Sequence, residues 1–224
     1  MASPGQGRGI FDSPAYVEAR QARLRNLFAH VDPASLAGRR VLELGCATGE
    51  LGQAFVEHGA TVVSVDARHA HIAELRARYP DRQAHVADLE TWDPGALGRF
   101  DAILCFGLLY HLATPGDFLA ACARASGILY LETVVVDASA SICLATDEAG
   151  DDQAFSLRGC RPSPSWITDT LARQGLAVRD ISGAAANWGG AAPSIFDWQI
   201  QDSGTWMRGN CFLRKMFVCT RECR

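Results

Sequence analysis

Lysine is scarce in this sequence: Lys215 is the only one, and acidic residues outnumber basic ones to give a formal net charge of −4. Proteins that capture nucleic acid through charge alone are usually basic, so this composition argues against such a role. No apolar run approaches the roughly 18 residues of a membrane-spanning helix. The first residues contain no apolar segment of a secretory signal. We therefore expect a cytoplasmic protein without a membrane partner.

The sequence also lacks the spacings that are typical of metal sites. Its eight cysteines are scattered, and none forms a Cys-x-x-Cys pair. His69 and His71 are two residues apart, so on a helix their side chains point in different directions. Several cysteines lie within apolar runs, such as Cys105 and Cys219, which favours buried thiols over disulfides in a chain without a signal. We expect no metal ion.

What the chain does contain is an alternation of strand-like and helix-like segments. Its 224 residues, 48% of them hydrophobic, give room for one domain of moderate size. Apolar and β-branched runs predict seven strands, at residues 41–45, 61–66, 83–88, 100–106, 127–135, 177–181 and 212–220. Helical crossovers between strands make them parallel. The sequence therefore predicts a doubly wound α/β fold, a mostly parallel seven-stranded sheet with helices on both faces.

Capping residues and apolar spacing mark the helices. Three helix starts combine an N-cap residue with a proline suited to the first turn: Ser13-Pro14, Thr114-Pro115 and Ser163-Pro164. We divide the chain into an N-terminal helical cap at residues 1–35 and a main domain at 36–224. The long connection at 136–162 is expected to be a loop that acts as a lid over an acceptor pocket.

In such a sheet, ligands bind at the carboxyl ends of the strands, near the point where strand order reverses. The first strand leads into Gly45-Cys46-Ala47-Thr48-Gly49, whose two glycines allow a tight turn close to a ligand. Glu43, on that strand, suits a cationic or amino-bearing ligand. The dinucleotide fingerprint Gly-x-Gly-x-x-Gly is absent, since Ala47 and Thr48 stand where its middle glycine would be.

The next three strands also end in residues suited to a ligand. Asp66 can accept hydrogen bonds from the hydroxyls of a ribose. Asp88-Leu89 pairs an acid with an apolar side chain, which suits the amino group and ring of an adenine. The fourth strand leads into Phe106-Gly-Leu-Leu-Tyr110-His111. In this order and spacing over residues 39–135, the motifs resemble those of class I S-adenosylmethionine-dependent methyltransferases.

That resemblance implies S-adenosylmethionine as the cofactor and a role for each matching position. The loop after the first strand would pass beneath the methionine part, the two acids would hold ribose and adenine, and the fourth strand end would line the side near the reactive methyl group. The residues assigned to cofactor binding are Glu43, Gly45, Cys46, Ala47, Gly49, Asp66, Ala67, Asp88, Leu89, Phe106 and Gly107.

His111 is the best candidate for a catalytic base, because it lies just past the fourth strand, where the methyl group should point. A hydroxyl acceptor must lose its proton, usually to a positioned base. The alternative is that His111 caps or packs the following helix. Tyr110 and Trp188 are candidates for substrate contact. Each also suits the core, Trp188 as part of an aromatic, glycine-rich loop that packs on the sheet.

Other acceptor-side candidates come from more distant segments. Glu132, near the end of the fifth strand, either contacts a substrate amine or hydroxyl or is a buried, hydrogen-bonded glutamate. Arg161, in the long connection, is expected to bind substrate. The acidic run at 147–152 is typical of a solvated face. The N-terminal helix, through Tyr16 and Arg20, either closes over the methionine end of the cofactor or only packs.

These features predict O-methylation of a hydroxyl on a sugar or other small metabolite. The segments Leu-Leu-Tyr-His-Leu, Leu131-Glu-Thr133 and Gly159-Cys-Arg-Pro162 are similar to family members in glycan and natural-product pathways. The Tyr-His pair also resembles enzymes that act on the tRNA wobble uridine, against which the acidic composition argues. A third interpretation is a regulator that binds the cofactor without catalysis. The acceptor, the methylated atom and the oligomeric state stay open.

Overall fold

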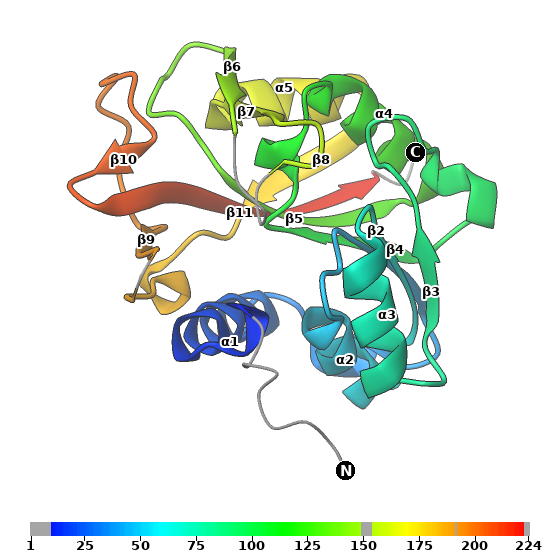
Figure 1. Cartoon of the computed structure of the whole chain (residues 1–224). Helices are drawn as coiled ribbons and strands as arrows, with labels where there is room; N and C mark the ends of the chain where they lie inside the picture. Colours follow the sequence, from blue (N-terminus) through cyan, green and yellow to red (C-terminus); the bar gives the residue numbers. More distant parts are fainter. Residues whose placement is uncertain (1–9, 149–153, 191, 222–224) are drawn as a thin grey trace.

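A nine-stranded sheet forms the centre of the structure, a computed structural model that describes residues 10–148, 154–190 and 192–221 (Figure 1). Its strands follow the order β10-β11-β5-β4-β1-β2-β3, and β8 and β9 also pair with β11. They are β1 (Arg40–Leu44), β2 (Thr61–Asp66), β3 (Gln83–Val86), β4 (Ala102–Phe106), β5 (Ile128–Val134), β8 (Leu176–Asp180), β9 (Ser194–Ile195), β10 (Met207–Arg208) and β11 (Cys211–Arg221). Strands β1 to β5 pair in parallel, whereas β11 runs antiparallel to β5 and β8. The predicted sheet is confirmed, and the short strands β9 and β10 are additions to it.

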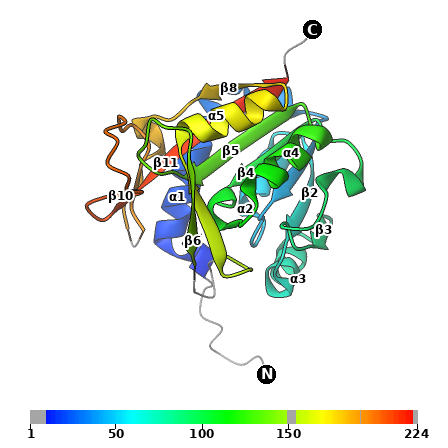
Figure 2. The same cartoon turned by 90° about the horizontal axis from the view of Figure 1, so that it is seen from above.

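Helices cover both faces of the sheet. The helices α1 (Pro14–Phe28), α2 (Glu50–Glu57) and α3 (His69–Arg78) lie on one face, and α4 (Pro115–Ala125) and α5 (Pro164–Arg173) lie on the other (Figure 1, Figure 2). The structure also contains the short 3-10 helices η1 (Ile10–Asp12), which precedes α1, and η2 (Pro33–Leu36), η3 (Pro94–Leu97), η4 (Leu109–His111) and η5 (Ala184–Ala186). The hydroxyls of Ser13 and Ser163 accept backbone hydrogen bonds at the starts of α1 and α5, as the Ser-Pro pairs predict.

The core consists of two main apolar layers, one on each side of the sheet. In β1, Val41 packs with Leu27 and Phe55 on the side of α1 and α2. Its neighbour Leu42 belongs to the layer on the side of α4 and α5, together with Leu119. Successive side chains of a strand point to opposite faces, so a strand covered on both faces must be apolar throughout. This explains the apolar runs that marked the strands in the sequence.

The connection between β5 and α5 is a correction to the sequence analysis. Instead of a loop, it contains an antiparallel hairpin of β6 (Cys143–Asp147) and β7 (Arg158–Pro162). The side chains of β6 are exposed or half-buried, so its sequence shows no apolar pattern by which a strand is recognised. Asp151 and Asp152 of the acidic run lie outside the described residues.

Three structural features are absent from the part of the chain that the structure describes. All seven cysteines in it are free thiols. No helix there is both long enough and apolar enough to cross a membrane. No group of three or more histidine, cysteine, aspartate or glutamate side chains within those residues could hold a metal ion.

Candidate active site

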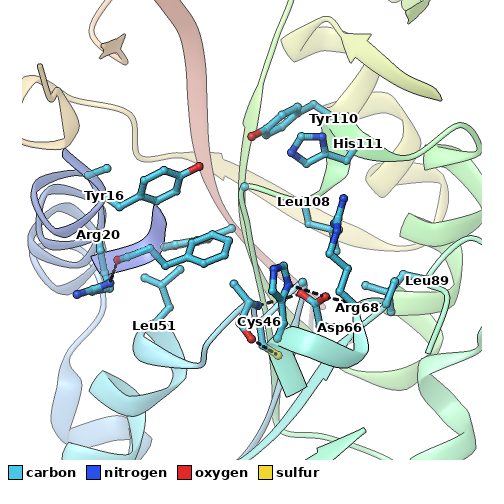
Figure 3. Close-up of a pocket in the computed structure, with 18 of the residues that line it drawn as sticks. Tyr16, Arg20, Cys46, Leu51, Asp66, Arg68, Leu89, Leu108, Tyr110 and His111 are labelled. Atoms are coloured by element: carbon cyan, nitrogen blue, oxygen red, sulfur yellow. Dashed lines mark hydrogen bonds and ion pairs between the residues drawn. The ribbon is translucent and has the colours of Figure 1, made fainter. Parts of the chain in front are cut away.

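A cavity of about 290 Å³ lies at the carboxyl ends of β1, β2, β3 and β4. Strand order reverses between β1 and β4, so the cavity is at the place where doubly wound sheets bind ligands. Helix α1 borders it on one side and η4 on another. Figure 3 shows Tyr16 and Arg20 of α1 across the cavity from Tyr110 and His111 of η4.

Most of the residues predicted to bind the cofactor line this cavity: Gly45, Cys46, Ala47, Asp66, Ala67, Asp88, Leu89, Phe106 and Gly107. The acceptor-side candidates that line it are Tyr110, His111 and Trp188. Four predicted residues do not line it: Glu43, Gly49, Glu132 and Arg161.

The loop after β1 turns through left-handed backbone conformations. Gly45, Ala47 and Gly49 have φ angles of 66°, 46° and 88°. Gly49 is the N-cap residue of α2, and a Cβ added there would lie 2.8 Å from the side chain of Leu75. Its role is therefore to shape the turn. Ala47 faces the cavity, and its backbone N–H donates a 2.9 Å hydrogen bond to Oδ2 of Asp66.

Asp66 is anchored at the end of β2 by its neighbours. Besides Ala47, its carboxylate accepts hydrogen bonds from the backbone N–H of Arg68 at 2.9 Å and from Nδ1 of His71 at 3.0 Å. A carboxylate offers about four acceptor positions, so about one is left for a ligand. His71 also lines the cavity.

The end of β3 presents Asp88 and the apolar side chain of Leu89 to the cavity. One carboxylate oxygen of Asp88 accepts the backbone N–H of Glu90 at 3.0 Å, which fixes a tight turn. Glu90 in turn accepts hydrogen bonds from the backbone N–H groups of Ala113 and Thr114. These hydrogen bonds hold the segment after η4 against the end of β3. The ends of β3 and β4 therefore share one cavity wall.

Glu43 does not line the cavity. Its carboxylate is buried and accepts 2.7 Å hydrogen bonds from the backbone N–H of Gly52 and the hydroxyl of Ser64, with Arg82 at 3.7 Å. Burial raises the pKa of Glu43 to about 7, although Ser64, Arg82 and Gly52 act in the opposite direction. Glu43 therefore ties β1, α2 and β2 together beneath the cavity.

His111 lies in η4, directly after β4, and lines the cavity beside Tyr110. The centroids of these two rings are 3.9 Å apart. Nδ1 of His111 forms a hydrogen bond with Oε2 of Glu148, the residue that follows β6. Glu148 belongs to the acidic run that was expected to be a solvated face, but it is only 5% exposed. That expectation is wrong for this residue.

Glu132 is the buried, hydrogen-bonded glutamate that the sequence analysis considered as an alternative. It is fully buried, and its two oxygens accept hydrogen bonds from Arg23 at 3.2 Å and Arg214 at 2.8 Å. Burial alone would raise the pKa of Glu132, but the two arginines outweigh it and lower the pKa. The two arginines, rather than Glu132, line the cavity.

Arg161 has a structural position behind η4. One guanidinium nitrogen donates to Glu148 at 2.6 Å, and another donates to the backbone carbonyls of Tyr110 and Cys160. It is 7% exposed and does not line the cavity. Arg161 thus links the β6–β7 hairpin to η4.

Trp188 and Tyr110 are two of the aromatic residues that line the cavity. The indole nitrogen of Trp188 donates to the carbonyl of Ala192 at 2.9 Å. Arg23 and Arg214 lie 5.4 Å and 5.3 Å from the centroid of the Trp188 ring. The hydroxyl of Tyr110 accepts a 3.3 Å hydrogen bond from Arg214. Aromatic rings held in this way suit the flat face of a sugar or another ring.

The cavity residues that the sequence analysis missed include His71, Arg23 and Arg214. His71 lies in the first turn of α3, which begins three residues after Asp66. A short connection of this kind places the first helical turn over the strand end. The short spacing between Asp66 and the start of the helix could therefore have indicated His71 as a cavity residue. Arg23 and Arg214 come from α1 and β11, at opposite ends of the chain, and no local pattern brings them to one site.

Comparison with known proteins agrees with this geometry. A family model described as a methyltransferase domain matches residues 16–180. The ubiquinone biosynthesis O-methyltransferase of Marinobacter nauticus is 28% identical over 173 residues, which cover 68% of this chain and 70% of that protein. A tRNA U34 carboxymethyltransferase of Pseudomonas aeruginosa is 36% identical over 181 residues, which cover 77% of this chain but only 53% of that protein.

A solved structure shares the fold. The N-terminal domain of EvdMO1, crystallised in the presence of SAH and D-fucose, superposes with a TM-score of 0.67 at 21% identity, over 95% of this chain and 84% of that chain. The chain belongs to the methyltransferase-domain family. It is an S-adenosylmethionine-dependent methyltransferase with a Rossmann-like fold, which confirms the family and the cofactor implied by the sequence motifs.

Proposed function

We propose that this enzyme methylates a hydroxyl group of a sugar or another small metabolite, with His111 as the general base. The observation that carries the proposal is the position of His111 in the cavity wall, immediately after β4 and close in sequence to Phe106 and Gly107. Two comparisons support a small hydroxylated acceptor: the O-methyltransferase relative, and the EvdMO1 domain crystallised in the presence of D-fucose.

The cavity residues fit the cofactor by their chemistry. Asp66 keeps about one acceptor position for a ribose hydroxyl. Asp88 and Leu89 offer an acceptor and an apolar surface to an adenine, and Arg20 of α1 offers a cation to the carboxylate of the methionine part. When bound, S-adenosylmethionine supplies a methyl group activated by a positively charged sulfur.

The residues of the chain then have two tasks in the transfer. The rings of Tyr110 and Trp188 orient the acceptor and exclude water. His111 takes the hydroxyl proton while the acceptor oxygen forms its bond to the methyl carbon, so the transfer leaves a protonated imidazole.

Modification of tRNA is the second candidate, because the carboxymethyltransferase relative is 36% identical over 77% of this chain. The chain spans about half the length of that relative, and its acidic balance offers little charge to a phosphate backbone. A tRNA enzyme should turn over only with RNA, and its activity should fall steeply with added salt. Binding of the cofactor without turnover on any acceptor would instead indicate a regulator.

Replacement of the base tests the proposal. In His111→Asn, kcat on the acceptor should fall by about 10²- to 10⁴-fold, while binding of S-adenosylhomocysteine stays unchanged. His69→Asn is the matched control, because His69 is exposed on α3 and does not line the cavity. Unchanged turnover in His111→Asn would remove His111 from its assigned role.

A further inference from the structure

The contact between His111 and Glu148 joins two segments that lie far apart in the sequence. Glu148 follows β6, in the β6–β7 hairpin, 37 residues after His111. Its Oε2 is hydrogen-bonded to Nδ1 of His111, and its side chain is almost fully buried. A carboxylate in such a place needs partners that compensate for the loss of water.

Arg161 of β7 is the second partner of Glu148. Its guanidinium donates a 2.6 Å hydrogen bond to Oε1 of Glu148, so the two carboxylate oxygens face two different partners. Arg161 also donates to the backbone carbonyl of Tyr110 at 3.2 Å, the residue next to His111. The arginine therefore fixes both Glu148 and the backbone of η4.

Gly159 shows how closely the hairpin and η4 are packed. A Cβ added to Gly159 would lie 2.3 Å from the backbone oxygen of Tyr110 and 2.9 Å from Cδ of Glu148. Any larger residue would push β7 away from η4. Nearby, the thiol of Cys160 contacts the carbonyl oxygen of Leu109 at 3.4 Å. These contacts hold the hairpin in register with the helix that carries His111.

The charges around Glu148 determine its protonation. Burial alone would raise the pKa of Glu148, but the hydrogen bonds and charges of His111 and Arg161 outweigh it and lower the pKa. Glu148 is therefore a carboxylate at neutral pH and can only accept hydrogen bonds. A neutral imidazole has one N–H, so it must place that hydrogen on Nδ1 to meet Glu148. This leaves Nε2 with the lone pair that a base requires.

We propose that Glu148, held by Arg161, is a positioning residue for His111: it fixes the Nδ1–H tautomer and the ring orientation, so that Nε2 is the atom that receives the acceptor proton. The inference rests on the proposed function of His111. The acceptor hydroxyl gives its proton to Nε2 as its oxygen gains the methyl group, and the resulting imidazolium is stabilised by the Glu148 carboxylate. Glu148 itself stays ionised.

The other ionisable groups near the ring come from several elements. Tyr110 lies beside it on η4, and Arg161 approaches from β7. Arg68, Glu90 and Arg214 share the cavity wall with it. In the described part of the structure, none of these groups is hydrogen-bonded to the His111 ring, whereas Glu148 is. Removal of the Glu148 carboxylate should therefore have the largest effect on the tautomer and orientation of the ring.

The first experiment reads the tautomer directly and needs no acceptor. The full-length protein is labelled with ¹⁵N-histidine, and the His111 signals are identified by their loss in His111→Asn. In the neutral form of the imidazole, wild-type His111 should show the Nδ1–H tautomer, and Glu148→Gln should show a mixture of tautomers. Asp147→Asn, at the exposed neighbouring position, is the control and should keep the wild-type signals. An unchanged tautomer in Glu148→Gln would overturn the proposal.

The second experiment measures turnover with labelled S-adenosylmethionine and an extract of the host as the source of acceptor. At a fixed amount of extract, Glu148→Gln should lower the rate of methyl transfer by at least about tenfold, because the carboxylate that fixes the tautomer of the base is gone, and should move the acid limb of the pH profile to lower pH. Glu148→Asp should recover part of the rate, and it also replaces Glu148→Gln if that variant does not fold. Full activity at an unchanged pH profile in Glu148→Gln would refute the positioning role.

The two proposals fail in different ways. If His111→Asn keeps full turnover while the tautomer still depends on Glu148, His111 is not the base although Glu148 orients it. If His111→Asn is inactive while the tautomer ignores Glu148, the base assignment stands and the positioning role is wrong.

Discussion

Arg23 of α1 and Glu132 of β5 form a buried ion pair at 3.2 Å, between residues 109 positions apart in the sequence. The second oxygen of Glu132 pairs with Arg214 of β11 at 2.8 Å. One carboxylate therefore links the N-terminal helix, the centre of the sheet and its antiparallel strand. Both arginines line the cavity, so the pair also shapes the site.

Removal of this carboxylate should be costly. Glu132→Gln leaves two buried guanidinium groups without a counter-charge, and breaking a buried pair in this way destabilises a protein by about 3–5 kcal/mol. We expect a loss of this size in the free energy of unfolding, measured by urea denaturation. Glu57→Gln, at an exposed position on α2, should change it by less than about 0.5 kcal/mol. A similar small change in both variants would contradict a stabilising role for the pair.

Glu43 should make stability fall as the pH rises from about 5 to 7. Its pKa is raised by burial from 4.5 to about 7, so the unfolded chain releases this proton at a lower pH than the folded protein. The contribution of Glu43 is fully present below about pH 4.5 and decreases by up to about 3 kcal/mol as the pH rises through 7. Glu43→Gln has no such proton. The difference in unfolding free energy between wild type and variant should therefore depend on pH, and parallel profiles would refute the assignment.

Ala47 holds a left-handed conformation at φ 46° that glycine adopts more easily. The left-handed conformation costs an alanine about 1–2 kcal/mol of folding free energy. A glycine avoids this cost, but it loses about 0.5–1 kcal/mol because it gives up more conformational freedom on folding. Ala47→Gly should therefore stabilise the protein by up to about 1 kcal/mol, and Ala47→Val should destabilise it by at least as much. Thermal and urea unfolding measure both. A destabilised Ala47→Gly would show that the side chain contributes more than the backbone strain costs.

Activity should survive a chelator. The sequence has no acid cluster of the metal-dependent catechol type, and the described residues contain no group of three potential ligands. The proposed deprotonation uses His111 instead. We expect turnover in EDTA to match turnover in buffer. A loss in EDTA that magnesium restores would replace the histidine mechanism with one that needs a metal.

The fold and the cofactor side of the cavity were accessible to sequence reasoning because their signals are local. The β-branched runs, the Ser-Pro caps and the acids at strand ends each lie within a few residues of the structure they determine. Asp66 and Asp88 come to one cavity because parallel strands place their carboxyl ends at one edge. The position of Glu43 outside the cavity was not visible in the sequence, because a carboxylate near the end of a strand looks the same whether it meets a ligand or a backbone N–H such as that of Gly52.

The acceptor side depends on contacts between distant segments, which a single sequence does not reveal. Glu148 looked like part of a solvated acidic run, because its partners His111 and Arg161 are 37 and 13 residues away. Arg161 was expected at the substrate, since an arginine in a long connection carries no sign of a buried partner. The β6–β7 hairpin, which brings Glu148 and Arg161 together, was not predicted because β6 is half-exposed and has no apolar face.

The measurement that tests the central claim most directly follows a labelled methyl group. The purified protein, the same protein with His111→Asn, and an extract of the host are incubated with methyl-labelled S-adenosylmethionine, and small molecules, RNA and protein are then separated. We expect label in the small-molecule fraction, on an oxygen, with wild type and not with His111→Asn. Label that enters RNA instead, and that declines steeply as salt is added, would contradict a small-molecule acceptor and identify a tRNA-modifying enzyme.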